Sequence, residues 1–78
     1  MKVCIVYRPE WTAHGYVLWR QVGEEEPRTV CRAGTTRYAA HYKTVSEALG
    51  ALAENAKADR AAGTRLGVEV EAVDVGMR

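Results

Sequence analysis

The sequence has no phenylalanine, one isoleucine and four leucines, so the large apolar side chains that fill most protein cores are scarce. Its hydrophobic fraction of 47% comes mainly from twelve alanines and ten valines. Because these side chains remove less apolar area from water, a 78-residue chain with this composition has a thin core. Association often completes such a core, and we therefore expect a homodimer that uses a sheet face or edge, or a complex with a target.

The sequence also lacks a long apolar run and an excess of charge of one sign. Without a transmembrane or signal segment, we expect a cytoplasmic protein with no membrane partner. The formal net charge of +1 argues against a nucleic-acid binder that works by overall phosphate neutralisation. Two cysteines in such a chain predict reduced thiols rather than a disulfide framework.

Histidine follows cysteine at a spacing of ten residues twice, at Cys4–His14 and at Cys31–His41. Structural zinc sites usually take two ligands from one tight turn, as in Cys-x-x-Cys, and neither pair has this spacing. We interpret both cysteines as small hydrophobes in strands, with a Cys4–Cys31 or an intermolecular disulfide as the alternative. No phosphate-binding glycine loop and no Cys–His nucleophile at a helix start is visible. We expect no catalytic residue, no cofactor and no metal.

Alternation of apolar and polar residues predicts four strands, over residues 2–7, 16–22, 28–33 and 66–73. Pro9 is expected to close the first strand, with a loop over residues 10–15. The last strand has one apolar and one acidic face and is expected to return beside the first by a crossover. A frayed tail is expected over residues 74–78.

A helix is predicted from Thr44 to about residue 62. Thr44 and Glu47 fit a capping box, in which Thr44 caps the N–H of Glu47 and Glu47 reaches back. Gly63 is the natural residue to end the helix. An apolar stripe at helical spacing would pack on the sheet, with Asp59 on another face; its members are Val45, Ala48, Leu49, Leu52 and Ala56. The chain is thus one α+β domain over residues 1–78, of order β-β-β-α-β, with one helix on a mainly antiparallel sheet.

Residues 35–43 have no clear pattern. Thr36, Tyr38, Ala40 and Tyr42 share one parity, which favours continuation of the third strand past a bulge at Gly34, whereas a long loop is the alternative.

Two surfaces are candidate binding sites. Residues 28–43 carry four positive charges and no acid, interleaved with tyrosines, which suits nucleic acid or an acidic protein surface. The second strand is apolar on both faces, so the face left uncovered by one helix would present Val6 and Trp19. The alternative for both is an ordinary solvated surface. The predicted partner-binding residues are Trp19, Arg32, Arg37, Tyr38, His41, Tyr42 and Lys43.

Residues 44–57 (TVSEALGALAENAK) resemble the corresponding helix of HicB-type antitoxins, which share the β-β-β-α-β order. As a whole, the chain is similar in size, strand order and lack of enzymatic residues to small phage-encoded anti-CRISPR proteins that act on type I systems. This resemblance implies a viral inhibitor that sits on a type I CRISPR effector complex and blocks target-DNA binding or nuclease recruitment. We therefore expect a non-catalytic binding protein, with a direct nucleic-acid-binding module or a HicB-like antitoxin as the alternative.

Overall fold

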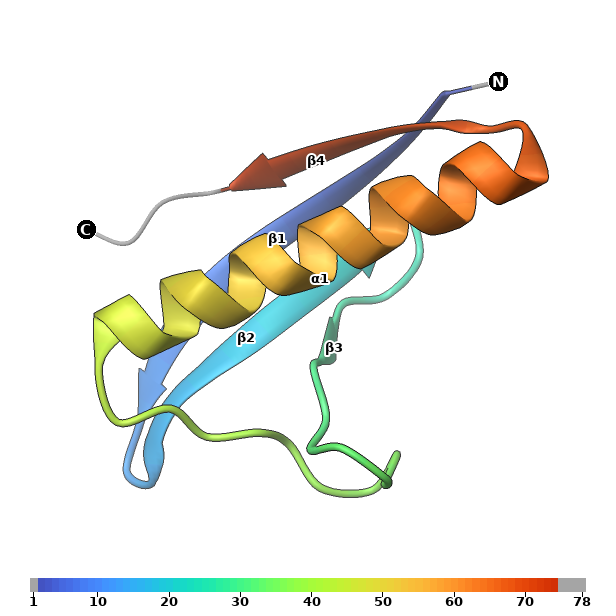
Figure 1. The fold of residues 1–78 in the computed structure, drawn as a ribbon. Helices are drawn as coiled ribbons and strands as arrows, with labels where there is room; N and C mark the ends of the chain where they lie inside the picture. Colours follow the sequence, from blue (N-terminus) through green and yellow to red (C-terminus); the bar gives the residue numbers. More distant parts are fainter. Residues whose placement is uncertain (1, 75–78) are drawn as a thin grey trace.

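The computed structural model describes residues 2–74 and has one helix on one face of a four-stranded sheet (Figure 1). The strand order in the sheet is β3-β2-β1-β4. The predicted α+β class and the β-β-β-α-β order are confirmed. Within the described residues, no helix combines the length and the apolar character needed to cross a membrane. The elements are β1 (Lys2–Thr12), β2 (Gly15–Val22), β3 (Arg28–Thr29), α1 (Val45–Leu66) and β4 (Glu69–Asp74).

The first hairpin is longer than the sequence predicts. β1 and β2 pair from Ile5↔Val22 to Thr12↔Gly15, so the prediction that Pro9 ends the strand before a loop over residues 10–15 was wrong. Within residues 2–74, β4 pairs with β1 from Lys2 to Tyr7, and Pro9 lies where β1 has β2 as its single described neighbour. A proline, which has no N–H to donate, is tolerated at such an edge position.

The crossover prediction is confirmed, because β4 lies parallel to β1, from Lys2↔Glu69 to Tyr7↔Asp74. The strand begins at Glu69 rather than at residue 66, since α1 continues further than expected. Of the tail expected over residues 74–78, Asp74 ends β4 and the remainder lies outside the described residues.

The start of α1 follows the prediction closely. Thr44 is the N-cap, and its Oγ1 accepts a hydrogen bond from the N–H of Glu47 at 3.1 Å. The Glu47 carboxylate reaches back one residue further than expected and accepts from the N–H of Lys43 at 2.9 Å. The two side chains thereby satisfy one donor of the first turn and one donor of the residue that precedes the cap.

The end of α1 differs from the prediction. The helix continues to Leu66 and is capped by Gly67 in the left-handed conformation, with φ 71°. Gly63, expected to end the helix, is instead buried inside it. A Cβ atom at Gly63 would lie 2.5 Å from Cγ2 of Val70 and 2.7 Å from the carbonyl oxygen of Val68. Glycine is therefore needed at this position for close packing against β4 rather than for a turn.

The core is as thin as the composition implies. Its buried centre contains Ile5, Tyr7, Leu18 and Ala56, and partly buried valines and alanines surround it. The apolar stripe of α1 is rotated from the predicted one, because Val45 and Leu49 are 39% and 40% exposed. Ala48 and Ala56 of the predicted stripe are buried, as is Gly63, and these small residues allow the helix to lie close to the sheet.

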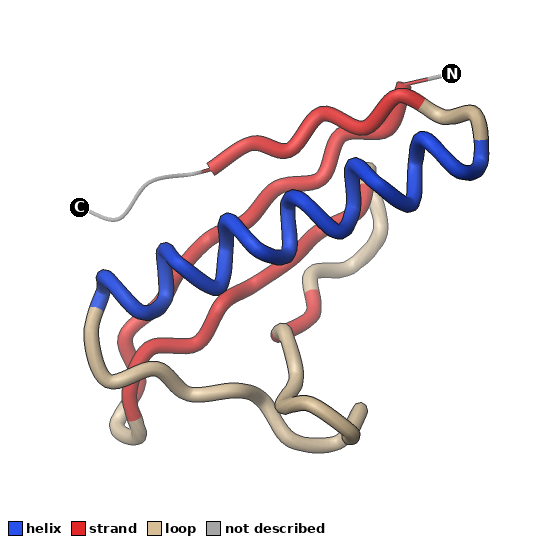
Figure 2. Tube along the Cα trace, in the orientation of Figure 1, coloured by secondary structure: helices blue, strands red, loops and turns tan. Residues whose placement is uncertain are grey.

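Residues 30–43, called the basic loop from here on, form a loop and not the predicted third strand over residues 28–33 continued through 35–43 (Figure 2). The loop starts at β2, where the N–H of Val30 donates to the Leu18 carbonyl at 2.8 Å. A turn then reverses the chain, with Gly34 at φ 81°. The chain returns antiparallel to itself, through a bridge between Cys31 and Ala39.

The basic loop also ends on β2. Tyr42 and Tyr16 exchange two backbone hydrogen bonds of 2.8 Å. A Cβ atom at Gly15, where φ is 119°, would lie 2.8 Å from the Tyr42 carbonyl oxygen. Glycine at the start of β2 therefore permits both the tight turn and the close approach of the loop.

The packing of Gly63 can be tested against a second helical glycine. We expect Gly63→Ala to lower the free energy of unfolding by about 1–3 kcal/mol, because the new methyl group overpacks the contact with β4. Gly50→Ala should raise it by about 0.5–1 kcal/mol, since a Cβ atom there meets nothing within 4 Å and glycine is a poor helix former. Urea unfolding of the two variants measures both changes. Equal effects of the two substitutions would contradict the packing role of Gly63.

Candidate functional site

The face of the sheet opposite α1, called the open sheet face, presents the tryptophan that the sequence singles out. Directly paired residues of neighbouring strands share a face, so Arg8 and Trp19 lie together while Tyr7 and Leu18 point to the helix. Val6 and Trp19, together with Arg8, Gln21 and Pro27, line a hollow of about 190 Å³. The structure thus brings Val6 and Trp19 together on the uncovered face.

The Trp19 ring is partly exposed, and its orientation is fixed by a polar neighbour. Its Nε1–H donates to the Glu10 carboxylate at 3.2 Å, across the β1–β2 hairpin. Val17, the other apolar β2 residue on this face, is buried. Trp19 is therefore the large apolar side chain of β2 that remains accessible on this face.

Charged side chains surround the apolar centre of the open sheet face. Lys2 and Glu71 form an ion pair of 2.5 Å between β1 and β4, and the hydrogen bond to Glu71 raises the pKa of Lys2. Arg8, Glu10 and Glu69 are the other charged residues on this face, by the strand register. An accessible aromatic centre with a charged rim of both signs is the usual anatomy of a protein–protein interface.

The basic loop brings three of the predicted binding residues together. The Arg32 guanidinium lies over the Tyr38 ring, 5.1 Å from its centroid. Arg32, Tyr38 and His41, with Ala39, line an open hollow of about 460 Å³. Because Tyr38 is 55% exposed, one face of this stacked pair is accessible to a ligand.

The remaining predicted residues lie elsewhere. Tyr42 packs against the core rather than on a binding surface, and burial raises the pKa of its hydroxyl. Arg37 lines a different cleft, described below. The backbone N–H of Lys43 belongs to the cap of α1. The single basic and aromatic surface that the sequence suggests is therefore divided, because the turn at Gly34 separates Arg37 from the Arg32–Tyr38 pair.

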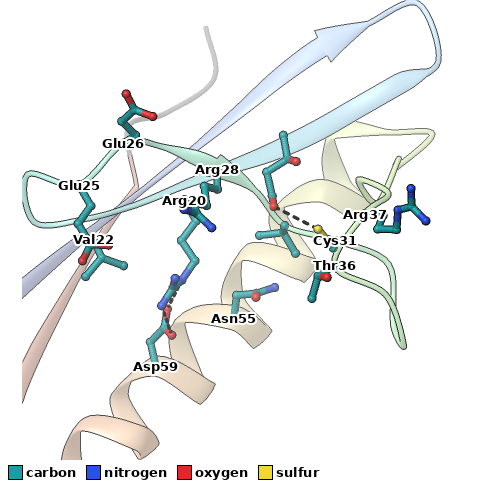
Figure 3. Close-up of a pocket in the computed structure, with 12 residues that line it drawn as sticks. Arg20, Val22, Glu25, Glu26, Arg28, Cys31, Thr36, Arg37, Asn55 and Asp59 are labelled. Atoms are coloured by element: carbon teal, nitrogen blue, oxygen red, sulfur yellow. Dashed lines mark hydrogen bonds and ion pairs between the residues drawn. The ribbon is translucent and has the colours of Figure 1, made fainter.

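A polar cleft of about 750 Å³, which the sequence does not predict, lies between α1, the end of β2 and the start of the basic loop (Figure 3). Asp59 from the helix and Arg20 from β2 meet within it, with Nη2–Oδ1 and Nε–Oδ2 distances of 2.8 and 3.1 Å. The Tyr7 hydroxyl also donates to Asp59. The prediction that Asp59 lies away from the packed face was wrong. One signal was available, because Asp59 follows Leu52 and Ala56 at helical spacing.

The electrostatics of this cluster are those of a structural clamp. Burial and the hydrogen bond to Asp59 raise the pKa of Tyr7 to about 12. Burial opposes ionisation of Asp59, but the hydrogen bonds from Arg20 and Tyr7 outweigh it and lower the pKa of the carboxyl group. The hydrogen bond to Asp59 likewise raises the pKa of Arg20. All three groups therefore stay in one protonation state near neutral pH, which fixes α1 to β1 and β2.

The cysteine and histidine residues do not gather into one cluster. His14 and His41 approach edge to face, with ring centroids 5.9 Å apart. Cys4 is an exposed thiol and Cys31 a partly buried one, and they are not bonded to each other. Across residues 2–74, no three histidine, cysteine or acidic side chains converge as metal ligands would.

Trp11 is a second exposed aromatic residue that the sequence placed in a loop. It lies in β1 beside Tyr16, with ring centroids 4.9 Å apart, and it is 63% exposed. The register puts Trp11 on the helix side of the sheet, so it does not belong to the open sheet face.

Comparisons of the chain with protein-family models, with curated proteins and with solved structures gave no match. Function is therefore inferred from the surfaces themselves.

The Tyr7–Asp59 hydrogen bond predicts a specific pH dependence. A tyrosine whose pKa is raised on folding stabilises the fold fully below its unfolded pKa of about 10 and loses this contribution as the pH rises towards 12. The free energy of unfolding of the wild-type protein should exceed that of Tyr7→Phe by roughly 1–2 kcal/mol at pH 7. This difference should shrink from pH 10 upward. Urea unfolding at pH 7, 9, 10 and 11 measures this difference in free energy, and Tyr38→Phe, which changes an exposed tyrosine, is the control. A constant difference up to pH 11 would refute the role given to this hydrogen bond.

Proposed function

We propose that this chain is a non-catalytic binding protein that docks onto a larger protein or ribonucleoprotein through its open sheet face. The observation that carries the proposal is the hollow beside Trp19, on a sheet face that the single helix leaves uncovered. Tryptophan and arginine are the residues most enriched among those that dominate binding energy, and Arg8 lies next to Trp19 in the same hollow.

The fixed orientation of the Trp19 ring favours binding of a partner. Its hydrogen bond to Glu10 orients the ring before any partner arrives, which reduces the conformational entropy lost on association. The charged rim carries both signs, and therefore suits a protein surface of mixed charge better than a uniform polyanion.

The target that we propose is a type I CRISPR effector complex in the cytoplasm of a bacterial host. The support is the similarity in size, strand order and lack of enzymatic residues to phage-encoded anti-CRISPR proteins. In this proposal the protein occupies a surface of the complex that target DNA or the recruited nuclease would use. Steric exclusion then suffices for inhibition, without any chemical step.

Matched tryptophan variants test both the target and the surface. In bacteria with an active type I system, we expect the wild-type protein to suppress interference with a targeted plasmid. Trp19→Ala should abolish suppression, with binding to the purified effector weakened by about 2 kcal/mol, or roughly thirtyfold. Trp11→Ala removes a tryptophan from the other face of the sheet, and this variant should still suppress interference.

The possible failures of this experiment are distinguishable. Unimpaired interference in the presence of well-expressed wild-type protein would refute the proposed target. Suppression by wild type and Trp19→Ala alike would refute the open sheet face as the docking surface. Arg8→Glu changes an exposed side chain of the same hollow and should act like Trp19→Ala without truncating a packed ring. Thermal unfolding of each variant confirms that it is folded.

Direct binding of single-stranded nucleic acid is a second candidate function, and the Arg32–Tyr38 pair is the observation that favours it. A base can stack on the exposed Tyr38 ring while Arg32 contacts phosphate or the neighbouring base. The basic loop carries Arg32, Arg37 and Lys43 and no acid, which supplies a local positive potential despite the nearly neutral chain.

Labelled oligonucleotides distinguish this second function. If it operates, fluorescence anisotropy should detect binding of single-stranded RNA or DNA that weakens steeply with salt. Tyr38→Ala should cost about 1–3 kcal/mol of binding free energy, the usual contribution of one stacked base, whereas Trp11→Ala should cost little. No binding by the wild-type protein at low salt would exclude this function.

A further inference from the structure

The outer edge of β4 is the longest unpaired strand edge in the described part of the chain. The sheet order places β4 at one end, with β1 as its single neighbour. β3 at the opposite end is only two residues long and continues into the basic loop, which pairs with β2. The edge of β4 therefore presents a row of unpaired backbone N–H and C=O groups, which is a template for an added strand.

From Glu69 to Ala72, the side chains of β4 divide by charge between the two faces of the sheet, and Val73 follows Glu69 and Glu71 on the open sheet face. Glu69 and Glu71 lie on the open sheet face, whereas Val70 and Ala72 lie on the helix side and pack against the core. The open sheet face of β4 thus carries two acids and no base. An added strand would therefore meet negative charge on one face and small apolar side chains on the other.

The inner neighbour of β4 shows which pattern fits it. In β1, Lys2 lies opposite Glu69 and pairs with Glu71 at 2.5 Å, and Val3 lies opposite Val70. A basic residue thus meets the acids on the open sheet face, and an apolar residue meets the valine on the helix side. Glu69 makes no ion pair of its own within residues 2–74 and is free to pair with a cation on its outer side.

Charge argues against a second copy of the chain at this edge. A twofold axis that pairs β4 with another β4 antiparallel must run perpendicular to the sheet, and so keeps each face on its own side. Residues of the same parity then lie opposite one another. Glu69 and Glu71 of one copy would then lie beside the same two acids of the other copy on the open sheet face. Like charges placed opposite each other on neighbouring strands are destabilising.

We propose that the β4 edge binds an extended segment of another protein in which Lys or Arg alternates with small apolar residues. The basic side chains pair with Glu69 and Glu71 on the open sheet face. The apolar side chains extend the layer formed by Val70 and Ala72 beside α1. Backbone hydrogen bonds to the edge supply affinity, and the alternation of the side chains supplies specificity. This site is separate from the Trp19 hollow and does not depend on the proposed function.

A short labelled peptide of alternating Lys and Val is the probe for this site. Fluorescence anisotropy should detect its binding to the wild-type protein, and Glu69→Lys should weaken that binding roughly tenfold. The matched control is Glu54→Lys, which makes the same change of net charge on an exposed position of α1 and should leave the affinity within about twofold. Equal losses in the two variants would show non-specific attraction and overturn the proposal.

Two further peptides separate strand addition from simple charge pairing. A Lys-Val peptide that is methylated at every backbone nitrogen carries the same charge but has no backbone N–H to donate, and it should not bind measurably. Binding as tight as that of the unmethylated Lys-Val peptide would overturn the proposal. A peptide of alternating Glu and Val should bind Glu69→Lys better than it binds wild type, a gain that an unfolded variant cannot produce. No such gain in a folded Glu69→Lys would also count against the site.

Discussion

The fold depends on how closely α1 approaches the sheet, and two helical residues one turn apart set that distance. Asp59 accepts hydrogen bonds from Tyr7 of β1 and from Arg20 of β2. Gly63 lets the Val70 side chain of β4 and the preceding Val68 carbonyl approach the helix closely. Large apolar side chains perform this function in most small domains. Here a polar clamp and a missing side chain do so, because a thin core of valine and alanine offers little area to bury. All three long strands are fixed to one helix in this way.

A single helix can cover only one face of the sheet, and the exposed features follow from that limit. The face beneath α1 absorbs nearly all the buried apolar residues, while the other face presents Trp19 in a hollow bordered by charge. The open edge of β4 lies beside the same face, so that Glu69 and Glu71 border both surfaces. The basic loop projects from the opposite edge of the sheet. The face of the sheet beneath α1 therefore stabilises the fold, whereas the open sheet face, the β4 edge and the basic loop are available for contacts.

Features encoded by neighbouring residues were predictable from the sequence, and so was one long-range feature, the crossover to β4, whereas the other features that depend on distant contacts were not. The capped start of α1, the alternation in the strands and the crossover to β4 were all foreseen, and alternation alone placed Trp19 on the uncovered face. Gly63 has the local appearance of a helix end, and only its contact with β4 explains why the helix continues past it. Asp59 was missed because its partners lie 52 and 39 residues away. The sequence predicts a surface position for Tyr42, because no local signal indicates its backbone pairing with Tyr16.

The parallel pairing of β1 with β4 also bears on the order in which the elements fold. Lys2 lies opposite Glu69, so this pairing closes a loop that contains nearly every described residue. The β1–β2 hairpin closes over two residues, and the helix needs only contacts within itself. Loop-closure entropy rises with the length of the loop, and folding slows as the mean sequence separation of contacts grows. The β1–β4 pairing is therefore the entropically most demanding contact in the sheet. It joins the first described strand to the last, and no shorter segment of the chain can form the complete sheet.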